Sequence, residues 1–133
     1  MVTISPWCFL SLNRLKTLSE KYDLMIDIKP VDIFSIFKNY GTKVLKERPL
    51  AIQKNRINEL KRWGNHLKIK FNIVPKFHPV NPEISSKIII AAYLYLQNTE
   101  KAFALVKKLC EAVWINELNV SDIETVKNIA IEL

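Results

Sequence analysis

The stretch SPWCFLSLNRLKTLSEKYDLMIDIKP, residues 5–30, decides the fold class because it predicts a helix followed directly by a strand. Pro6 suits the first helical position, where its missing N–H costs nothing, and Ser5 is then the natural N-cap. Apolar residues recur near helical spacing from there, which predicts a helix from Pro6 to about Lys21. Residues from Leu24 to Pro30 alternate in a way that is typical of a strand. The stretch therefore predicts an α/β protein.

The rest of the chain is predicted to be mostly helical, with residues 68–81 extended and irregular because they carry two prolines. The apolar run IIIAAYLYL, residues 88–96, covers more than one helix face, so its helix should be the most buried. Because a lone strand has no ladder partner, we expect an incomplete domain. Apolar and capping patterns predict helices near residues 33–37, 50–67, 82–96, 99–114 and 121–133.

Length and composition fit one domain: 133 residues, 49% of them hydrophobic, with a net charge of +7. No apolar run reaches the ~18 residues that a membrane span needs, and no signal peptide is recognisable. The two cysteines, Cys8 and Cys110, are far apart in apolar surroundings and indicate reducing cytosol. We therefore expect a cytoplasmic protein without a membrane partner. The positive charge favours anions in general, whether nucleic acid, membrane surface or small carboxylate.

Ser5 and Cys8 are three residues apart at a helix start, the spacing of a C-x-x-C thiol site with serine in first place. Unpaired N–H groups and the helix dipole stabilise a thiolate at such a position. A serine hydroxyl cannot form a disulfide, but it can donate a hydrogen bond to the thiolate of another molecule. The alternative interpretation is structural: Ser5 only caps the helix, and Cys8 is a small buried apolar residue.

The remaining aromatic, histidine and cysteine residues predict structure rather than chemistry. Trp63 and Trp114 lie on apolar helix faces and, with Cys110, are expected in the core. His66 and His78 have no cysteine or acidic cluster near them in the sequence, so we expect no metal site. With only two glycines, the chain has no dinucleotide-binding or P-loop motif.

A basic surface is expected on the helix at residues 50–67, formed by Lys54, Arg56, Lys61 and Arg62. It is either a solvated face or an anion site. Nucleic acid is disfavoured as its ligand because aromatic residues are not interleaved on that face.

Four segments in this order resemble the 2-hydroxychromene-2-carboxylate isomerases, relatives of kappa-class glutathione transferases and of DsbA. They are SPWCFL, NELKRWGNHLKIKFNIVP, KFHPVNPEISSK and CEAVWINELNVSD, and the resemblance extends from residue 5 to about residue 126. It implies a DsbA-like thioredoxin domain, with residues 1–48 as its N-terminal part and 49–133 as a helical insertion. The family's later strands and its cis-proline loop have no counterpart, so we expect a truncated member.

The resemblance also implies an activity, a cofactor and site residues. The family's catalytic serine, which hydrogen-bonds the glutathione thiol, corresponds to Ser5, with Pro6 and Trp7 beside it. The implied reaction is a glutathione-dependent isomerisation of a small aromatic carboxylate, an intermediate of aromatic degradation. We expect an incomplete chain to show little or no such activity. From charge and position near the matching segments, we expect Lys38, Lys54 and Arg56 to bind carboxylates of glutathione or substrate.

Two other functions remain open from the sequence. One is a DsbA-like thiol–disulfide oxidoreductase that uses Cys8. The other is a non-enzymatic basic helical module that binds nucleic acid or a protein partner. Phe9, Leu12 and Leu15 would be exposed under the first helix of an incomplete domain, so a homodimer also remains open.

Overall fold

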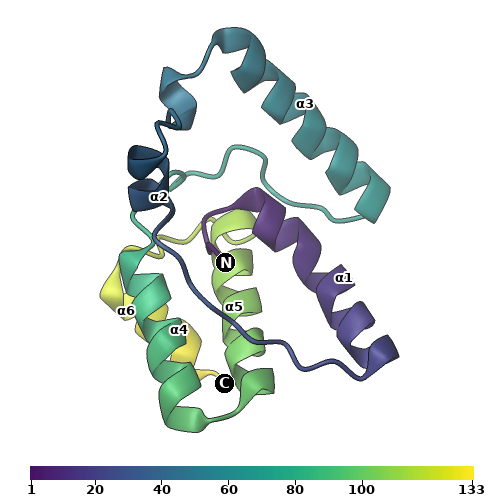
Figure 1. Ribbon diagram of the computed structural model, residues 1–133, viewed down its shortest axis with the longest axis vertical. Coiled ribbons are helices and arrows are strands. Elements are labelled where there is room, and N and C mark those ends of the chain that lie inside the picture. The colour runs from purple at the N-terminus through teal and green to yellow at the C-terminus, as the bar shows by residue number, and fades with distance from the viewer.

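The computed structural model describes residues 1–133 as an all-helical protein (Figure 1). It has no β-strand, so the expectation of an α/β chain is wrong in its strand and correct in its mostly helical content. Six α-helices and one 3₁₀ turn follow each other along the chain: α1 (Pro6–Tyr22), α2 (Ile33–Asn39), η1 (Leu45–Glu47), α3 (Leu50–Leu67), α4 (Glu83–Leu96), α5 (Thr99–Trp114) and α6 (Ile123–Ile131).

Helix α5 is the centre of the core, and α1, α4 and α6 pack around it (Figure 1). Nine of its sixteen residues are buried, including the whole predicted stripe from Phe103 to Trp114. The expectation that α4 is the most buried helix is wrong, because only Ser85 and Ile89 of α4 are buried. Only one side of α4 packs on α5 and α6, so the apolar residues on its other side, such as Leu94, remain exposed.

Helix α1 begins and ends where the sequence predicts. The Ser5 side chain caps it by accepting a 3.4 Å hydrogen bond from the backbone N–H of Cys8. Asp23 ends it in the left-handed conformation. Phe9 and Leu12 turn inward and are buried, which positions the first turn of α1 firmly against α5.

The predicted strand at Leu24–Pro30 is not a strand, because nothing completes a ladder beside it. The segment runs extended across α5, with Ile28 buried and Met25 almost fully exposed (Figure 1). Its backbone makes two hydrogen bonds: the Leu24 N–H donates to the Ser19 carbonyl at 2.8 Å, and the N-terminus of Met1 donates to the Lys29 carbonyl at 2.5 Å. The alternating pattern therefore predicted a strand wrongly, since a strand needs a second edge to pair with.

Helix α3 stands apart from the bundle in Figure 1 and is tied to it through the irregular segment at residues 68–81. The ring of Phe71 lies 5.6 Å from Phe9 and 6.2 Å from Trp114, measured between ring centroids. Trp114 is buried as expected, but Trp63 is 37% exposed, which corrects its assignment to the core. Leu60 and Gly64, one turn apart, are the buried residues on the inner face of α3, and Trp63 lies at the edge of that face.

Ser121 and Glu124 have capping-box spacing, which predicts Ser121 as the N-cap of the final helix, but the helix begins one residue later. Asp122, not Ser121, is its N-cap, because the Asp122 carboxylate accepts from the backbone N–H of Thr125 at 2.9 Å. The Ser121 hydroxyl instead donates to Asn119 at 2.6 Å. In the irregular segment, the peptide bond between His78 and Pro79 is cis.

The substitution Gly64→Ala should destabilise the protein although alanine favours helices. A Cβ at this position would lie 2.8 Å from the Phe71 ring and 3.3 Å from the Ile69 carbonyl oxygen. The helix-propensity gain of about 1 kcal/mol is smaller than the typical overpacking cost of about 1–3 kcal/mol. Urea denaturation should show a lower free energy of unfolding, whereas Asn58→Ala on the exposed face of α3 should not lower it. A more stable Gly64→Ala variant would show that the Phe71 ring is not packed tightly against α3 at Gly64.

The extended segment should exchange its amide hydrogens rapidly. The N–H groups from Met25 to Lys29 donate no hydrogen bond, whereas the amides of α5 are paired within a buried helix. Hydrogen exchange followed by NMR should therefore show little protection at Asp27 and strong protection at Leu109. Comparable protection at both residues would mean that the segment is paired in solution.

Candidate functional site

The first turn of α1, which lies below α3 in Figure 1, carries Ser5, Trp7 and Cys8. Ser5 is partly buried, and its oxygen accepts from the Cys8 N–H while its own hydroxyl hydrogen has no acceptor in the protein. Trp7 is exposed, Cys8 is partly buried and Pro6 is buried. The positive end of the α1 dipole coincides with this turn. A hydroxyl free to donate beside a positive helix end is suited to bind an anionic sulfur or oxygen.

His78 lies directly beside this turn. Its Nε2 is 3.1 Å from the carbonyl oxygen of Ile4, the residue before Ser5, so Nε2 carries the hydrogen and donates it. The imidazole also packs on Trp114, with 4.8 Å between ring centroids. Burial lowers the pKa of His78, the nearby Arg56 lowers it further, and the hydrogen bond to Ile4 opposes both effects. His78 is therefore held mainly as the neutral imidazole near pH 7.

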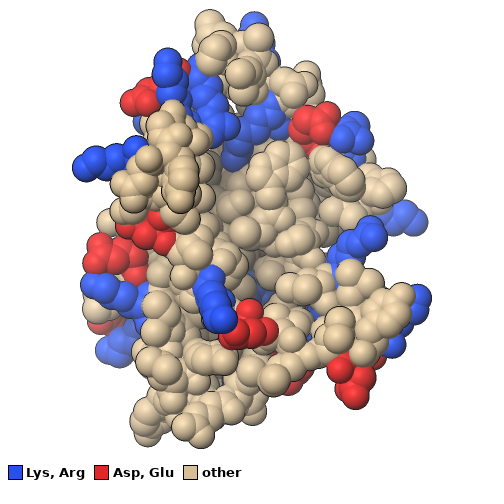
Figure 2. All heavy atoms as spheres, in the orientation of Figure 1, with Lys and Arg blue, Asp and Glu red and all other residues tan.

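Arg56 and Arg48 add positive charge around His78. Arg56 is partly buried on the inner side of α3, and burial followed by repulsion from Arg48 lowers its pKa. Arg48 is fixed by three contacts: its Nε donates to the Lys43 carbonyl at 2.9 Å, its guanidinium lies 5.8 Å from the Phe37 ring centroid, and its carbonyl accepts from Gln53 at 2.8 Å. Figure 2 shows Lys and Arg side chains gathered around the hollow below α3.

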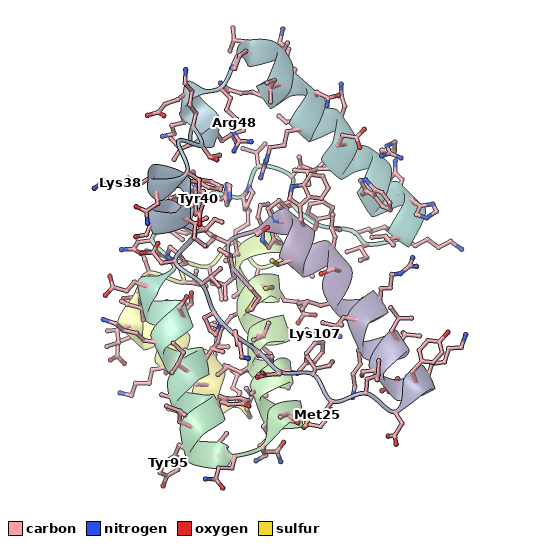
Figure 3. The ribbon with its side chains drawn as sticks, viewed as in Figure 1. Met25, Lys38, Tyr40, Arg48, Tyr95 and Lys107 are labelled. Carbon is pink, nitrogen blue, oxygen red and sulfur yellow. The ribbon has the colours of Figure 1, made fainter.

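The structure separates the basic residues that the sequence grouped together. Lys54 and Arg56 are two positions apart on α3, which turns them about 200° from each other around the helix. Arg56 therefore faces inward, while Lys54 is exposed. Lys38 is also exposed and points outward from α2, whereas Arg48 lies beside the space below α3 (Figure 3). Of the three predicted carboxylate ligands, only Arg56 is placed near the first turn of α1.

The two cysteines differ in their surroundings. Cys110 is fully buried, as predicted; burial raises the pKa of its thiol, and the nearby Cys8 raises it further. Cys8 lies in the first turn of α1, where backbone N–H groups are available to a thiolate. Both thiols are free, and only Cys8 is at all accessible.

Other kinds of site have less support in the structure. No three His, Cys, Asp or Glu side chains come close enough together to hold a metal ion. No helix combines the length and apolar character that crossing a membrane requires. A cavity of about 700 Å³ lies between α2 and α4, away from Ser5, and it is lined by residues such as Phe34, Pro82 and Ile90.

A family model matches almost the whole chain. The model of the DSBA-like thioredoxin domain matches residues 3–133, so the chain belongs to the DSBA-like thioredoxin domain family. Among solved structures, the fold is similar to that of a 2-hydroxychromene-2-carboxylate isomerase, with a TM-score of 0.66 and 18% sequence identity. The similarity covers 97% of this chain and 68% of the isomerase. No match was found among curated protein sequences.

Sequence reasoning missed two residues of this site, His78 and Arg48. His78 lies in the segment KFHPVNPEISSK, but it was considered only as a metal ligand and not as a neighbour of Ser5. Arg48 precedes α3 by two residues, outside the helical pattern that drew attention to Lys54 and Arg56. Only the resemblance to the isomerases could have linked His78 with Ser5, because both residues lie in segments that resemble this family.

The pKa of His78 provides a direct test of this arrangement. An NMR titration of the folded protein should give a lower midpoint for His78 than in the urea-unfolded chain, where about 6.5 is expected. The unfolded state then binds more protons, so the stability due to His78 is complete above pH ~6.5 and falls as the pH drops below it. Arg56→Met should raise the folded midpoint, while Lys54→Met should leave it unchanged. A folded midpoint at or above the unfolded one contradicts the placement.

Proposed function

We propose that the chain binds glutathione at the first turn of α1 and acts as a glutathione-dependent isomerase of the 2-hydroxychromene-2-carboxylate isomerase type. The observation that carries the proposal is the Ser5 hydroxyl, whose hydrogen has no acceptor within the protein and which sits at the positive end of a 17-residue helix. The similarity in fold to an enzyme of this name supports the same conclusion.

The residues at the site fit a thiol ligand. Ser5 would donate its hydroxyl hydrogen to the sulfur, and the helix dipole would favour the ionised form of that sulfur. When bound, glutathione would supply a thiolate that adds reversibly to the unsaturated bond of the substrate, which permits ring opening and rotation without net oxidation. Partly buried His78 and Arg56 would exclude water from one side, and the Arg56 guanidinium would keep the surroundings positive. Trp7, which is exposed, offers an apolar surface for the substrate ring.

A DsbA-like thiol–disulfide oxidoreductase is the second candidate, favoured by the partly accessible Cys8 in the first turn of α1. Ser5 stands where such an enzyme has its first cysteine, so Cys8 could form mixed disulfides with other molecules. Cys110 cannot easily serve as a resolving thiol because it is buried and its pKa is raised. This candidate ranks below the isomerase for that reason.

The substitution Ser5→Ala should raise the pKa of the bound glutathione thiol. The hydrogen bond it removes, between a neutral donor and a charged acceptor, is worth roughly 1.5–3 kcal/mol, which corresponds to about one to two pKa units. The ultraviolet absorbance of the thiolate, followed against pH in the saturated complex, measures the shift. The comparison is made with Cys8→Ser present both in the Ser5→Ala variant and in the protein that keeps Ser5, so that the accessible Cys8 thiol does not contribute to the absorbance.

The matched control is Ser11→Ala, one and a half turns along the same helix. The Ser11 hydroxyl donates to the Cys8 carbonyl at 2.8 Å and is exposed, so its loss should leave the titration midpoint unchanged. An unchanged midpoint in Ser5→Ala itself would remove Ser5 from the mechanism. If glutathione binds neither of these proteins, while the chain that keeps Cys8 forms mixed disulfides with glutathione at that residue, the oxidoreductase assignment replaces the isomerase.

A further inference from the structure

The extended segment at residues 24–30 leaves a row of backbone groups unpaired. From Met25 to Ile28, no backbone N–H donates a hydrogen bond and no backbone carbonyl accepts one. The N–H of Lys29 is also without an acceptor. Unpaired N–H and C=O groups along an extended chain are a template for pairing with another strand, and this protein has no strand of its own to supply.

Met1 marks the edge of the segment that is open to pairing. Its N-terminus donates to the Lys29 carbonyl, and its carbonyl accepts from the Val31 N–H at 3.2 Å, which is the pattern of a single rung between parallel strands. Alternate residues of an extended chain direct their backbone groups to the same edge, so Met25 and Asp27 face the same side as Lys29. All three residues are exposed, and a second chain can therefore reach their backbone groups.

A hollow of about 250 Å³ lies along this edge of the segment, between α1 and α5. Figure 1 shows the segment crossing α5 between α1 and α4. The walls of the hollow are apolar, and they include Leu12 and Leu15 of α1, Phe103 and Val106 of α5, and Ile26 of the segment itself. A strand that paired with the segment would place every second side chain against these walls.

The outer face of the segment is charged. Asp27 and Lys29 have exposed side chains that form an ion pair at 2.8 Å. A neighbouring strand with a basic side chain beside Asp27 and an acidic side chain beside Lys29 would complement both charges. The edge therefore fits a strand in which apolar residues on one face alternate with charged residues on the other.

We propose that residues 25–29 bind such a strand, an extended peptide segment of a partner protein, in the same direction as Met1. The backbone of the peptide would accept from the N–H groups of Asp27 and Lys29 and donate to the carbonyls of Met25 and Asp27. Its apolar side chains would enter the hollow. Backbone hydrogen bonds supply affinity in this mode of recognition, and the side-chain contacts supply specificity. The surface does not involve Ser5, so it is independent of the proposed glutathione function.

The test uses the peptide acetyl-Thr-Val-Lys-Val-Glu-amide, whose lysine would lie beside Asp27 and whose glutamate would lie beside Lys29. When it is added to the full chain, NMR should show saturable shifts of the Asp27 and Lys29 amide signals and slower hydrogen exchange at both. The same peptide with N-methyl groups on both valines cannot donate these hydrogen bonds and should bind at least roughly tenfold more weakly. Exchanging its lysine and glutamate should weaken binding about threefold.

Two substitutions on α1 test the hollow. Leu15→Glu puts a charge into the apolar wall and should weaken binding of the peptide at least roughly tenfold. Leu18→Glu is the matched control, because Leu18 is 38% exposed against 41% for Leu15 but does not line the hollow. It should bind the peptide as the unchanged chain does. Both positions are on the surface, so circular dichroism should show that both variants remain folded.

Three results would overturn the proposal: no saturable shifts at millimolar peptide, equal binding of the N-methylated peptide, or equal weakening by Leu18→Glu. A second copy of the chain is the competing occupant. If rising protein concentration alone protects the amides of Asp27 and Lys29 and the chain sediments as a dimer, the edge pairs with that copy instead. Ser5→Ala should bind the peptide normally, so loss of glutathione binding and loss of peptide binding are separate outcomes.

Discussion

The packing around Trp114 is the interaction on which the rest of the structure depends. Trp114 ends the central helix α5 and is fully buried. Its ring contacts Phe71 on one side and His78 on another, and its carbonyl accepts from the backbone of Asn72 at 2.7 Å. One residue thereby fixes the irregular segment at 68–81, which has no regular hydrogen-bonding pattern of its own.

The packing of Trp114 supports the candidate site through two neighbouring side chains. Through His78, the Trp114 ring supports the carbonyl of Ile4 and with it the start of α1, where Ser5 lies. Through Phe71, which packs against the place where Gly64 has no side chain, the same ring holds α3 and its inward-facing Arg56. The first turn of α1 and the basic residues below α3 are thus parts of one packed unit, although they lie about fifty residues apart in the sequence.

The sequence correctly predicted those features that depend on neighbouring residues in the chain, such as helix starts and apolar helix faces. The Ser5–Pro6 cap fixes the start of α1, and the apolar stripe from Phe103 to Trp114 correctly marks α5 as core. The alternation of Leu24–Pro30 specifies extended backbone, but a strand also needs a neighbour, and none lies beside it. The run IIIAAYLYL is apolar all round, yet burial depends on how many neighbours surround α4, which hydropathy does not record. In the site, Ser5 followed from its motif, whereas Arg48 and His78 belong to it only through tertiary contacts.

The central proposal is that glutathione binds at the first turn of α1 beside His78, and an NMR map of glutathione binding tests it most directly. Backbone amide signals would be followed while glutathione is added to the full chain under reducing conditions. The account predicts that the largest shifts fall on residues 5–8 and 78, with smaller shifts at Arg48 and Arg56. No saturable shifts, or shifts centred on the cavity between α2 and α4 near Phe34 and Ile90, would contradict it.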